Sequence, residues 1–259
     1  MHRTLPILAL VAFLQSCELQ QSAVVTPQRP TVSFDTATTR EGSFELETGI
    51  AIEPDTLFDS PNTLKYGASQ DTELFVGWSP WQRVAQPGQD AEGSSDLVLG
   101  TRHRLFEAGE GTPSGAFVMS GKLPTASVGD GLGSGELDLR LGVILNQQIG
   151  SVNTNLFYQY GALGNPDGAG FASEQTATLT AGVPLSERFA AFAEVGGTFV
   201  PARDTRALFS IVGASLTAST QCVIDSAVFV GLSNDAPDVQ LYFGCTYNLG
   251  SIKARPVRP

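Results

Sequence analysis

Apolar and polar residues alternate along most of this chain from residue 43 onward. The clearest case is the segment 135–145, GELDLRLGVIL, in which Glu136, Asp138 and Arg140 occupy one parity and aliphatic residues the other. Successive side chains of a β-strand point to opposite faces of a sheet. The segment therefore predicts a strand with one charged face and one aliphatic face.

The alternation recurs at fairly even spacing, with turn sequences such as NPDG at 165–168 and NDAP at 234–237 between the segments. The pattern predicts about twelve strands. Their expected ranges are 43–53, 61–68, 72–80, 94–106, 113–125, 134–148, 151–161, 172–184, 187–200, 205–219, 221–233 and 237–249. An even count is typical of a closed single-chain bacterial barrel.

Two environments are compatible with strands of this kind. In a soluble sandwich the charged faces would meet water, whereas in a membrane barrel the aliphatic faces would meet lipid and the charges the lumen. Only helices and closed barrels satisfy every backbone group in lipid, and after residue 16 no apolar run reaches the length of a spanning helix. We therefore predict an all-β fold, an antiparallel transmembrane β-barrel over residues 43–250.

Residues 1–16 have the features of an export signal, with a positive start, a short apolar core and a small residue before Cys17. The sequence LQSC at 14–17 is similar to the lipobox of bacterial lipoproteins, which makes Cys17 a lipidation candidate. Ordinary cleavage nearby is the alternative. The polar residues 17–42 predict a flexible leader, and residues 251–259 form a basic tail. Export with a lipid-facing barrel predicts the bacterial outer membrane as the location.

Composition narrows the class of protein further. Apolar residues make up 42% of the chain and charged residues 16%, a mixture too apolar for disorder. The formal net charge of −11, without a basic stripe, excludes nucleic acid as a partner because a phosphate backbone would be repelled.

Several short motifs occur in a fixed order along the predicted barrel. They are LKYG at 64–67 with TEL at 72–74, GWSPW at 77–81, DLVLGT at 96–101, KLPT at 122–125 with GSGE at 133–136, and GLSNDAPD at 231–238. Over residues 43–250 the chain resembles the outer-membrane barrel family named for the MetA pathway of phenol degradation. The resemblance implies a barrel loosely described as a transporter, without a defined substrate.

One feature departs from many outer-membrane barrels, whose last strand ends on an aromatic residue that the assembly machinery reads. Here the YNLG sequence at 247–250 is followed by the basic tail. We still expect the assembly machinery and membrane lipid as partners.

Ten charged residues share the inward parity of the first six strands. These lumen candidates are Glu45, Glu47, Glu73, Asp96, Arg102, Arg104, Lys122, Glu136, Asp138 and Arg140. Charges inside a barrel must be paired or hydrated, so they form either a salt-bridged plug in a narrow barrel or a polar permeation path. We also expect the six from Arg102 to Arg140 to form one network, because they lie on three consecutive strands.

The sequence offers little for catalysis or for binding a cofactor. His103 shares the lipid-facing parity of Leu99 and Leu105, where an interfacial aromatic role is favoured over that of a catalytic base. The GLGSG sequence at 131–135 precedes a strand, so it predicts a hairpin loop and no phosphate site. No cluster with zinc-ligand spacing is present, and we expect no metal, no cofactor and no enzyme activity.

Cys222 and Cys245 lie on the outward face of the final hairpin, about four positions out of register. This offset favours two free thiols over a disulfide. The leading hypothesis for function is passive passage of small molecules, with hydrophobic or aromatic compounds as candidate solutes. A non-conducting structural or adhesion barrel is the alternative.

Overall fold

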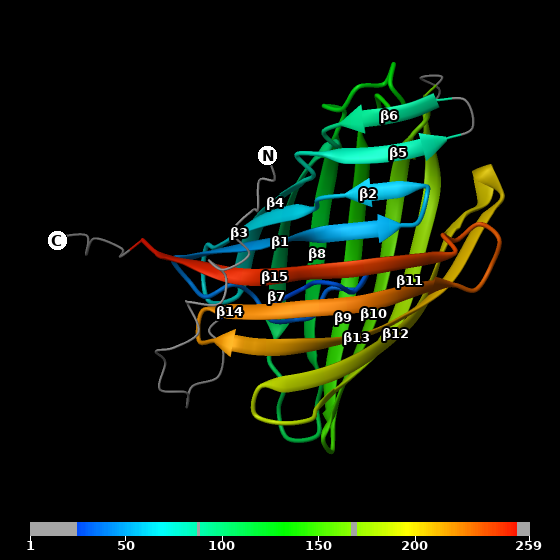
Figure 1. Ribbon diagram of the computed structural model, residues 1–259. Coiled ribbons are helices and arrows are strands. Elements are labelled where there is room, and N and C mark those ends of the chain that lie inside the picture. Colours follow the sequence, from blue (N-terminus) through cyan, green and yellow to red (C-terminus); the bar gives the residue numbers. More distant parts are fainter. Residues whose placement is uncertain (1–24, 87–88, 167–169, 253–259) are drawn as a thin grey trace, which may run out of the picture.

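The alternating segments form the wall of a closed antiparallel β-barrel in the computed structural model, which describes residues 25–86, 89–166 and 170–252 (Figure 1). The wall strands are β1 (Ser43–Glu53), β3 (Asn62–Gly67), β4 (Thr72–Trp78), β7 (Leu97–Phe106), β8 (Ser114–Leu123), β9 (Asp138–Ile149), β10 (Val152–Gly164), β11 (Phe171–Pro184), β12 (Phe189–Val200), β13 (Thr205–Ser219), β14 (Cys222–Gly231) and β15 (Val239–Ser251). β15 pairs with β1 and closes the sheet. The predicted twelve-stranded antiparallel barrel is confirmed.

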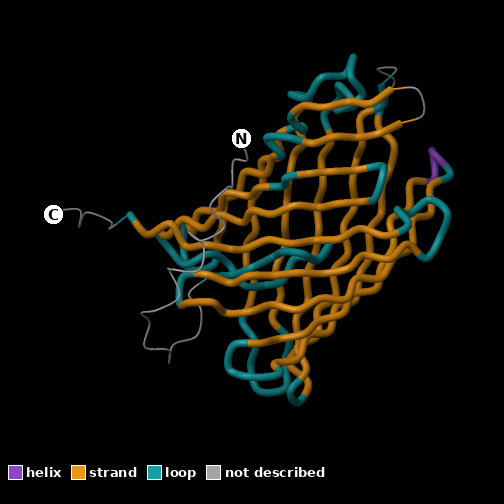
Figure 2. Tube along the Cα trace, viewed as in Figure 1, coloured by secondary structure: helices purple, strands orange, loops and turns teal. Residues whose placement is uncertain are grey.

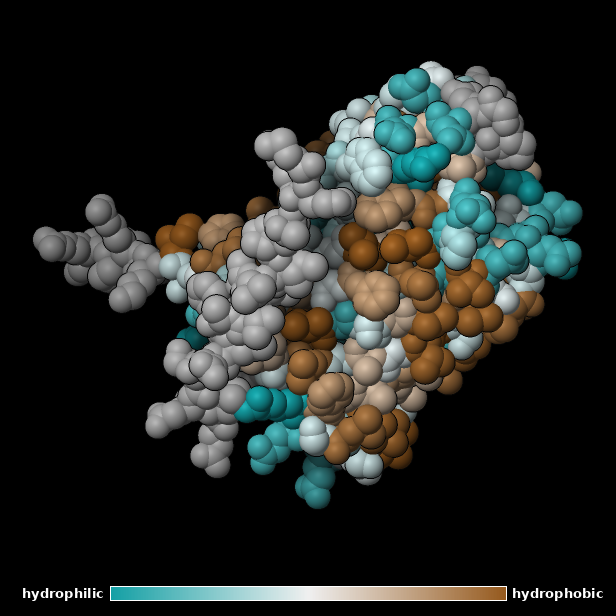
Figure 3. All heavy atoms as spheres, viewed as in Figure 1, coloured by the Kyte–Doolittle hydropathy of each residue, from teal (hydrophilic) through white to brown (hydrophobic). Residues whose placement is uncertain are grey.

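The two faces of the wall follow the sequence alternation. Along β9, Asp138, Gly142 and Ile144 are buried, whereas the leucines and valine between them are exposed. Hydrophobic residues, drawn in brown, gather over the outer surface of the strands in the view of Figure 3. This outward face suits contact with hydrocarbon.

The two ends of the barrel differ in the length of their connections. At one end, termed the turn end, the connections are short, and the longest spans residues 107–113. β1 begins and β15 ends there, at the left of Figure 1. At the opposite loop end the connections are longer, up to residues 79–96.

Three short strands at the loop end lie outside the barrel closure and were not predicted. β2 (Leu57–Asp59) pairs with the end of β1, β5 (Gln82–Gln86) pairs with β2, and β6 (Gln89–Gly93) pairs with β5. The 3-10 turn η2 (Pro201–Arg203) forms most of the β12–β13 connection. No helix among the described residues is long and apolar enough to cross a membrane.

The final hairpin places the two described cysteines near each other. Cys222 lies opposite Tyr247 and Ile224 lies opposite Cys245, so the cysteines are offset by two positions instead of the four we expected. The difference arises because the strand pairing centres the β14–β15 connection between Asn234 and Asp235, one residue earlier than the centre of the NDAP sequence at 234–237. Both thiols are free, as predicted.

A charged substitution at the middle of an outward face tests the assigned facing. Val143 lies at the centre of β9 and is 53% exposed, so Val143→Arg is expected to lower the free energy of unfolding by about 2–4 kcal/mol in a bilayer. Leu139→Arg is the matched control: Leu139 is 50% exposed, but it is the second residue of the strand, where the cost falls to about 0–1 kcal/mol. Urea unfolding from liposomes measures both. A cost near zero for Val143→Arg would contradict its outward facing, and equal costs at the two positions would contradict their assigned depths.

Candidate functional site: the occupied lumen

The predicted lumen residues differ in how deeply they are buried. Glu45, Glu47, Glu73 and Arg102 are almost fully buried. The remaining six, Asp96, Arg104, Lys122, Glu136, Asp138 and Arg140, are buried or half-buried. The inward face also carries apolar side chains, in a cluster around Phe75 and Phe157 and in a second cluster around Phe209 and Phe229.

Residues 25–42, termed the plug, occupy the lumen. The trace of this segment is enclosed by the strands of the wall (Figure 2). Its hydrogen-bond partners lie on β1, β3, β4, β8, β10 and β12, on several sides of the barrel. This differs from the flexible leader that we expected for residues 17–42, whose first part, with Cys17 and the export signal, lies outside the described residues.

Four wall carboxylates hold the plug by accepting hydrogen bonds from its backbone. Glu45 accepts from the Thr26 N–H at 3.1 Å, and Glu47 accepts from the Gln28 N–H at 2.8 Å. Glu194 accepts from the N–H groups of Val32 and Ser33, at 2.8 and 3.1 Å. Glu73 accepts from the N–H and the hydroxyl of Thr39, at 2.8 and 2.6 Å. The wall therefore satisfies backbone donors that have no strand partner.

Aromatic packing fixes the middle of the plug. The Phe34 ring lies 6.0 Å from the Phe75 ring and 5.9 Å from the Phe157 ring, centroid to centroid. The Arg102 guanidinium lies over the Phe34 ring, 5.8 Å from its centroid. Asn155 Nδ2 donates to the Phe34 carbonyl at 2.8 Å. The plug thus joins the first apolar cluster as well as the carboxylates.

Arg29 occupies a seat formed by two glycines. Gly49 and Gly244 lie opposite each other on β1 and β15, and a Cβ on either one would overlap the Arg29 guanidinium. Arg29 Nη2 donates to the Phe243 carbonyl at 3.3 Å, and Arg29 Nε lies 3.7 Å from Asp225 Oδ1. The glycines therefore make room for a cation at the part of the plug that reaches deepest along β1.

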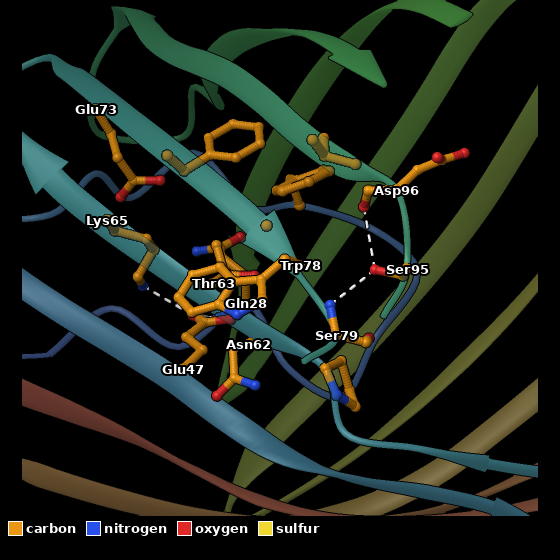
Figure 4. A pocket seen from close by; sticks show the side chains of 15 residues that line it. Gln28, Glu47, Asn62, Thr63, Lys65, Glu73, Trp78, Ser79, Ser95 and Asp96 are labelled. Carbon is orange, nitrogen blue, oxygen red and sulfur yellow. Dashed lines mark hydrogen bonds and ion pairs between the residues drawn. The ribbon is translucent and has the colours of Figure 1, made fainter. Parts of the chain in front are cut away.

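Lys65 on β3 links the wall carboxylates beside the start of the plug. Its ammonium lies 2.9 Å from Glu45 Oε2 and 2.8 Å from Glu47 Oε1, and it donates to the Thr26 carbonyl. The Lys65 side chain is 1% exposed. Figure 4 shows Lys65 and Glu47 turned toward each other at the edge of a cavity.

The expected single network of six charges is wrong, because the structure divides these residues among three places. Lys122 bonds Asp96 Oδ2 at 2.8 Å and lies 3.5 Å from Asp138, toward the loop end. Arg140 continues this group by bonding Glu174 at 2.8 Å. Strand tilt and stagger separate residues that share parity, so Arg102 and Arg104 find other partners.

Arg102 is fully buried and bonds Glu73 at 3.1 Å. Arg104 lies at the turn end, where it pairs with Asp71 and Glu107 at 2.7 and 2.9 Å. Glu136 belongs to the loop-end group only through its backbone, since its carbonyl accepts from Lys122 Nζ at 2.9 Å.

Asp96 anchors the loop-end group just before β7 begins. Burial raises the pKa of Asp96, but hydrogen bonds from Lys122 Nζ and from the N–H groups of Ala126 and Thr125 outweigh this effect. The pKa of Asp96 is consequently lowered from its usual value, so the carboxylate stays charged. These bonds also tie the β8–β9 loop to the wall.

A cavity of about 310 Å³ lies between the plug and strands β3, β4 and β7 (Figure 4). Aromatic side chains of Phe34, Phe75 and Trp78 line it, together with Glu47 and Lys65. Its volume lies at the lower end of the range typical of small-molecule sites. A smaller cavity of about 170 Å³ lies on the β10–β12 side of the plug.

Sequence reasoning missed three wall residues that matter for this arrangement, namely Lys65, Glu194 and Asp225. Each is a charged residue on the inward parity of its strand, which was the available signal. His103 lies on the outward face as expected, bonded to the Thr72 hydroxyl at 3.0 Å and packed on Phe117. Among the described residues no group of three or more His, Cys, Asp or Glu side chains could hold a metal.

Comparisons with known proteins place the fold among outer-membrane channels. No protein-family model matches the sequence, and no curated protein is similar to it. The COG4313 outer membrane channel from Pseudomonas putida F1 is similar in structure, with a TM-score of 0.68 and 15% identity, covering 85% of this chain and 100% of that one.

Two porins are similar to a lesser degree. The KdgM porin in complex with disordered oligogalacturonate has a TM-score of 0.57 and 9% identity over 80% of this chain and 99% of that one. The NanC porin has a TM-score of 0.54 and 7% identity, covering 80% of this chain and 100% of that one. These likenesses support an outer-membrane barrel fold but not the phenol-degradation family in particular. The protein has the closed twelve-stranded antiparallel barrel fold of outer-membrane channels.

Proposed function

We propose that this protein is an outer-membrane pore or transporter for small molecules, with hydrophobic or aromatic compounds as its candidate solutes, and that the plug closes it. The observation that carries the proposal is that the lumen is wide enough to hold a chain segment which most of the wall contacts through hydrogen bonds. Polar contacts of this kind can be exchanged for water, whereas an apolar core cannot. The likeness in fold to channels and porins supports the same reading.

The orientation follows from the connections. In outer-membrane barrels the short turns face the periplasm and the long loops face the outside. The turn end would then face the periplasm, so the plug would enter from the periplasmic side. A lipid on Cys17 would be consistent with this placement, because Cys17 precedes Val25 by only a few residues.

The aromatic lining supports the choice of solute. The 310 Å³ cavity is bordered by Phe34, Phe75 and Trp78. Phe209 and Phe229 stack at 5.1 Å in the second apolar cluster, also inside the barrel. Small flat molecules would find apolar contact surfaces along a passage that is otherwise polar. We propose no enzymatic role, since the observations favour transit through the lumen.

A structural barrel remains the second candidate, favoured by the buried Arg102–Glu73 pair and by the firm hold on the plug. In that case the plug would be part of the folded core, and the barrel would not conduct. The wall carboxylates would then serve stability alone.

Deleting residues 25–39 separates the two functions. The deletion keeps residues 40–42, whose backbone bonds Gly67 and starts β1. We expect the deleted barrel to show larger and longer single-channel openings in a planar bilayer than the full chain, and faster entry of phenol into liposomes. A barrel that retains heat-modifiable gel mobility but conducts no ions in either form would overturn the pore and favour the structural role.

A further inference from the structure

The turn-end half of the lumen carries an excess of carboxylates. The wall contributes five, Glu45, Glu47, Glu73, Glu194 and Asp225, all nearly fully buried. Lys65 and Arg102 are the two wall cations that face them. Five negative and two positive charges leave a formal charge of −3 on these seven buried side chains.

The plug supplies hydrogen-bond donors to these carboxylates. Its backbone N–H groups and hydroxyls bond four of the five carboxylates, and Arg29 approaches the fifth. Its own Asp35 is occupied within the plug, by Gln28 and the Ala37 N–H. The plug therefore occupies the carboxylates in the way that a donor-rich or cationic ligand would.

Two buried carboxylates have oxygens that lack a donor with the plug in place. Glu45 Oε1 accepts no hydrogen bond from the described residues, and neither oxygen of Asp225 does. Asp225 is 2% exposed and lies beside the seat of Arg29. A buried acceptor without a partner is costly, so the lumen retains capacity for further cations or donors.

We infer that the plug is an internal competitor for cations, and that the barrel selects cations over anions whenever the plug leaves the turn-end half. This inference rests on the proposed pore. Once the plug leaves, its donors must be replaced, and in a confined passage a net negative wall admits cations preferentially. Because cations and plug use the same carboxylates, raising the cation concentration must shift the equilibrium toward the open form.

A reversible disulfide between the plug and the wall, termed the lock, tests the inference in the full-length chain. Ser33 Oγ and Thr180 Oγ1 lie 2.9 Å apart, so cysteines at these two positions are placed to form a disulfide between plug and β11. Cys17, Cys222 and Cys245 are changed to serine, and the protein is refolded into bilayers. The single variants Ser33→Cys and Thr180→Cys control for the lost hydroxyls, which also contact Glu194.

We expect the oxidised lock to suppress the open state, and a reductant added to the bath to restore it. The reduced protein, measured in a KCl gradient, should reverse at a potential that gives several-fold higher permeability to K⁺ than to Cl⁻. Adding spermidine should lengthen the openings of the reduced protein and leave the oxidised protein unchanged.

Neutralising the carboxylates identifies the source of selectivity. In the barrel lacking residues 25–39, Glu45→Gln with Glu194→Gln should move the reversal potential toward zero. The matched control, Glu107→Gln with Asp90→Asn, changes exposed carboxylates outside the lumen and should leave it unmoved. A conducting barrel that favours anions or shows no preference would overturn the inference and leave the pore intact. Absence of conduction in every variant, the deleted barrel included, would overturn the proposed pore itself.

Discussion

Replacing Lys65 with methionine is expected to lower the free energy of unfolding by about 3–5 kcal/mol, because two buried carboxylates would lose their shared cation. Glu45 and Glu47 both lie within 2.9 Å of the Lys65 ammonium, and all three side chains are nearly fully buried. Methionine fills a similar volume without a charge, so the loss measures the ion pairs and not a cavity. Urea unfolding of the refolded barrel in liposomes is the measurement.

Two controls make the Lys65 result specific. Arg83→Met breaks an ion pair with Asp90 in which the side chains are 50% and 55% exposed, so it should cost no more than about 1 kcal/mol. Adding Glu45→Gln and Glu47→Gln to Lys65→Met removes the uncompensated charges and should recover a large part of the lost stability. A cost for Lys65→Met as small as that of Arg83→Met would refute the part given to this lysine.

The strands of the barrel wall could be predicted from the sequence because the alternation of apolar and polar residues is a local property of each segment. The segment 135–145 alternates so strictly that charged and aliphatic faces are evident without any partner strand, and β1 has the predicted bounds of 43–53. The strands β5 and β6 escaped prediction because they are short and polar and show no alternation of apolar residues. A strand that buries no apolar face has no alternation of apolar and polar residues, so its sequence does not predict it.

The plug could not be predicted because its contacts are neither periodic nor local. Val32 bonds a carboxylate 162 positions away, and Phe34 is fixed by an asparagine 121 positions away. A polar segment before the first strand is typical of a flexible leader, and only the closed barrel brings Glu194 and Glu73 to its two sides. The charges of the wall were predictable as inward-facing, but their partners depend on stagger and on this insertion.

Reversing the charge of Arg29 is expected to displace the plug from the lumen. In Arg29→Glu a carboxylate would sit over Gly49 and Gly244, beside the buried Asp225, where two like charges in a poorly hydrated site repel each other. A change of about 3–5 kcal/mol in plug binding, the size seen when a buried pair is broken, corresponds to roughly a hundredfold or greater rise in the open fraction. Maleimide labelling of a cysteine placed at Ser33, which is buried in the seated plug, reports this fraction as a rate.

The charge-swapped variant decides whether the Arg29 seat acts through electrostatics. Arg29→Glu combined with Asp225→Arg restores an opposite pair across the same gap, and it should return labelling at Ser33 toward the rate of the parent chain. Arg29→Met, which removes the charge without reversing it, should fall between the two because the attraction is lost but no repulsion is added. If the swap labels as fast as Arg29→Glu, the glycine seat holds arginine by shape and by the Phe243 carbonyl, and Asp225 has no part in closing the lumen.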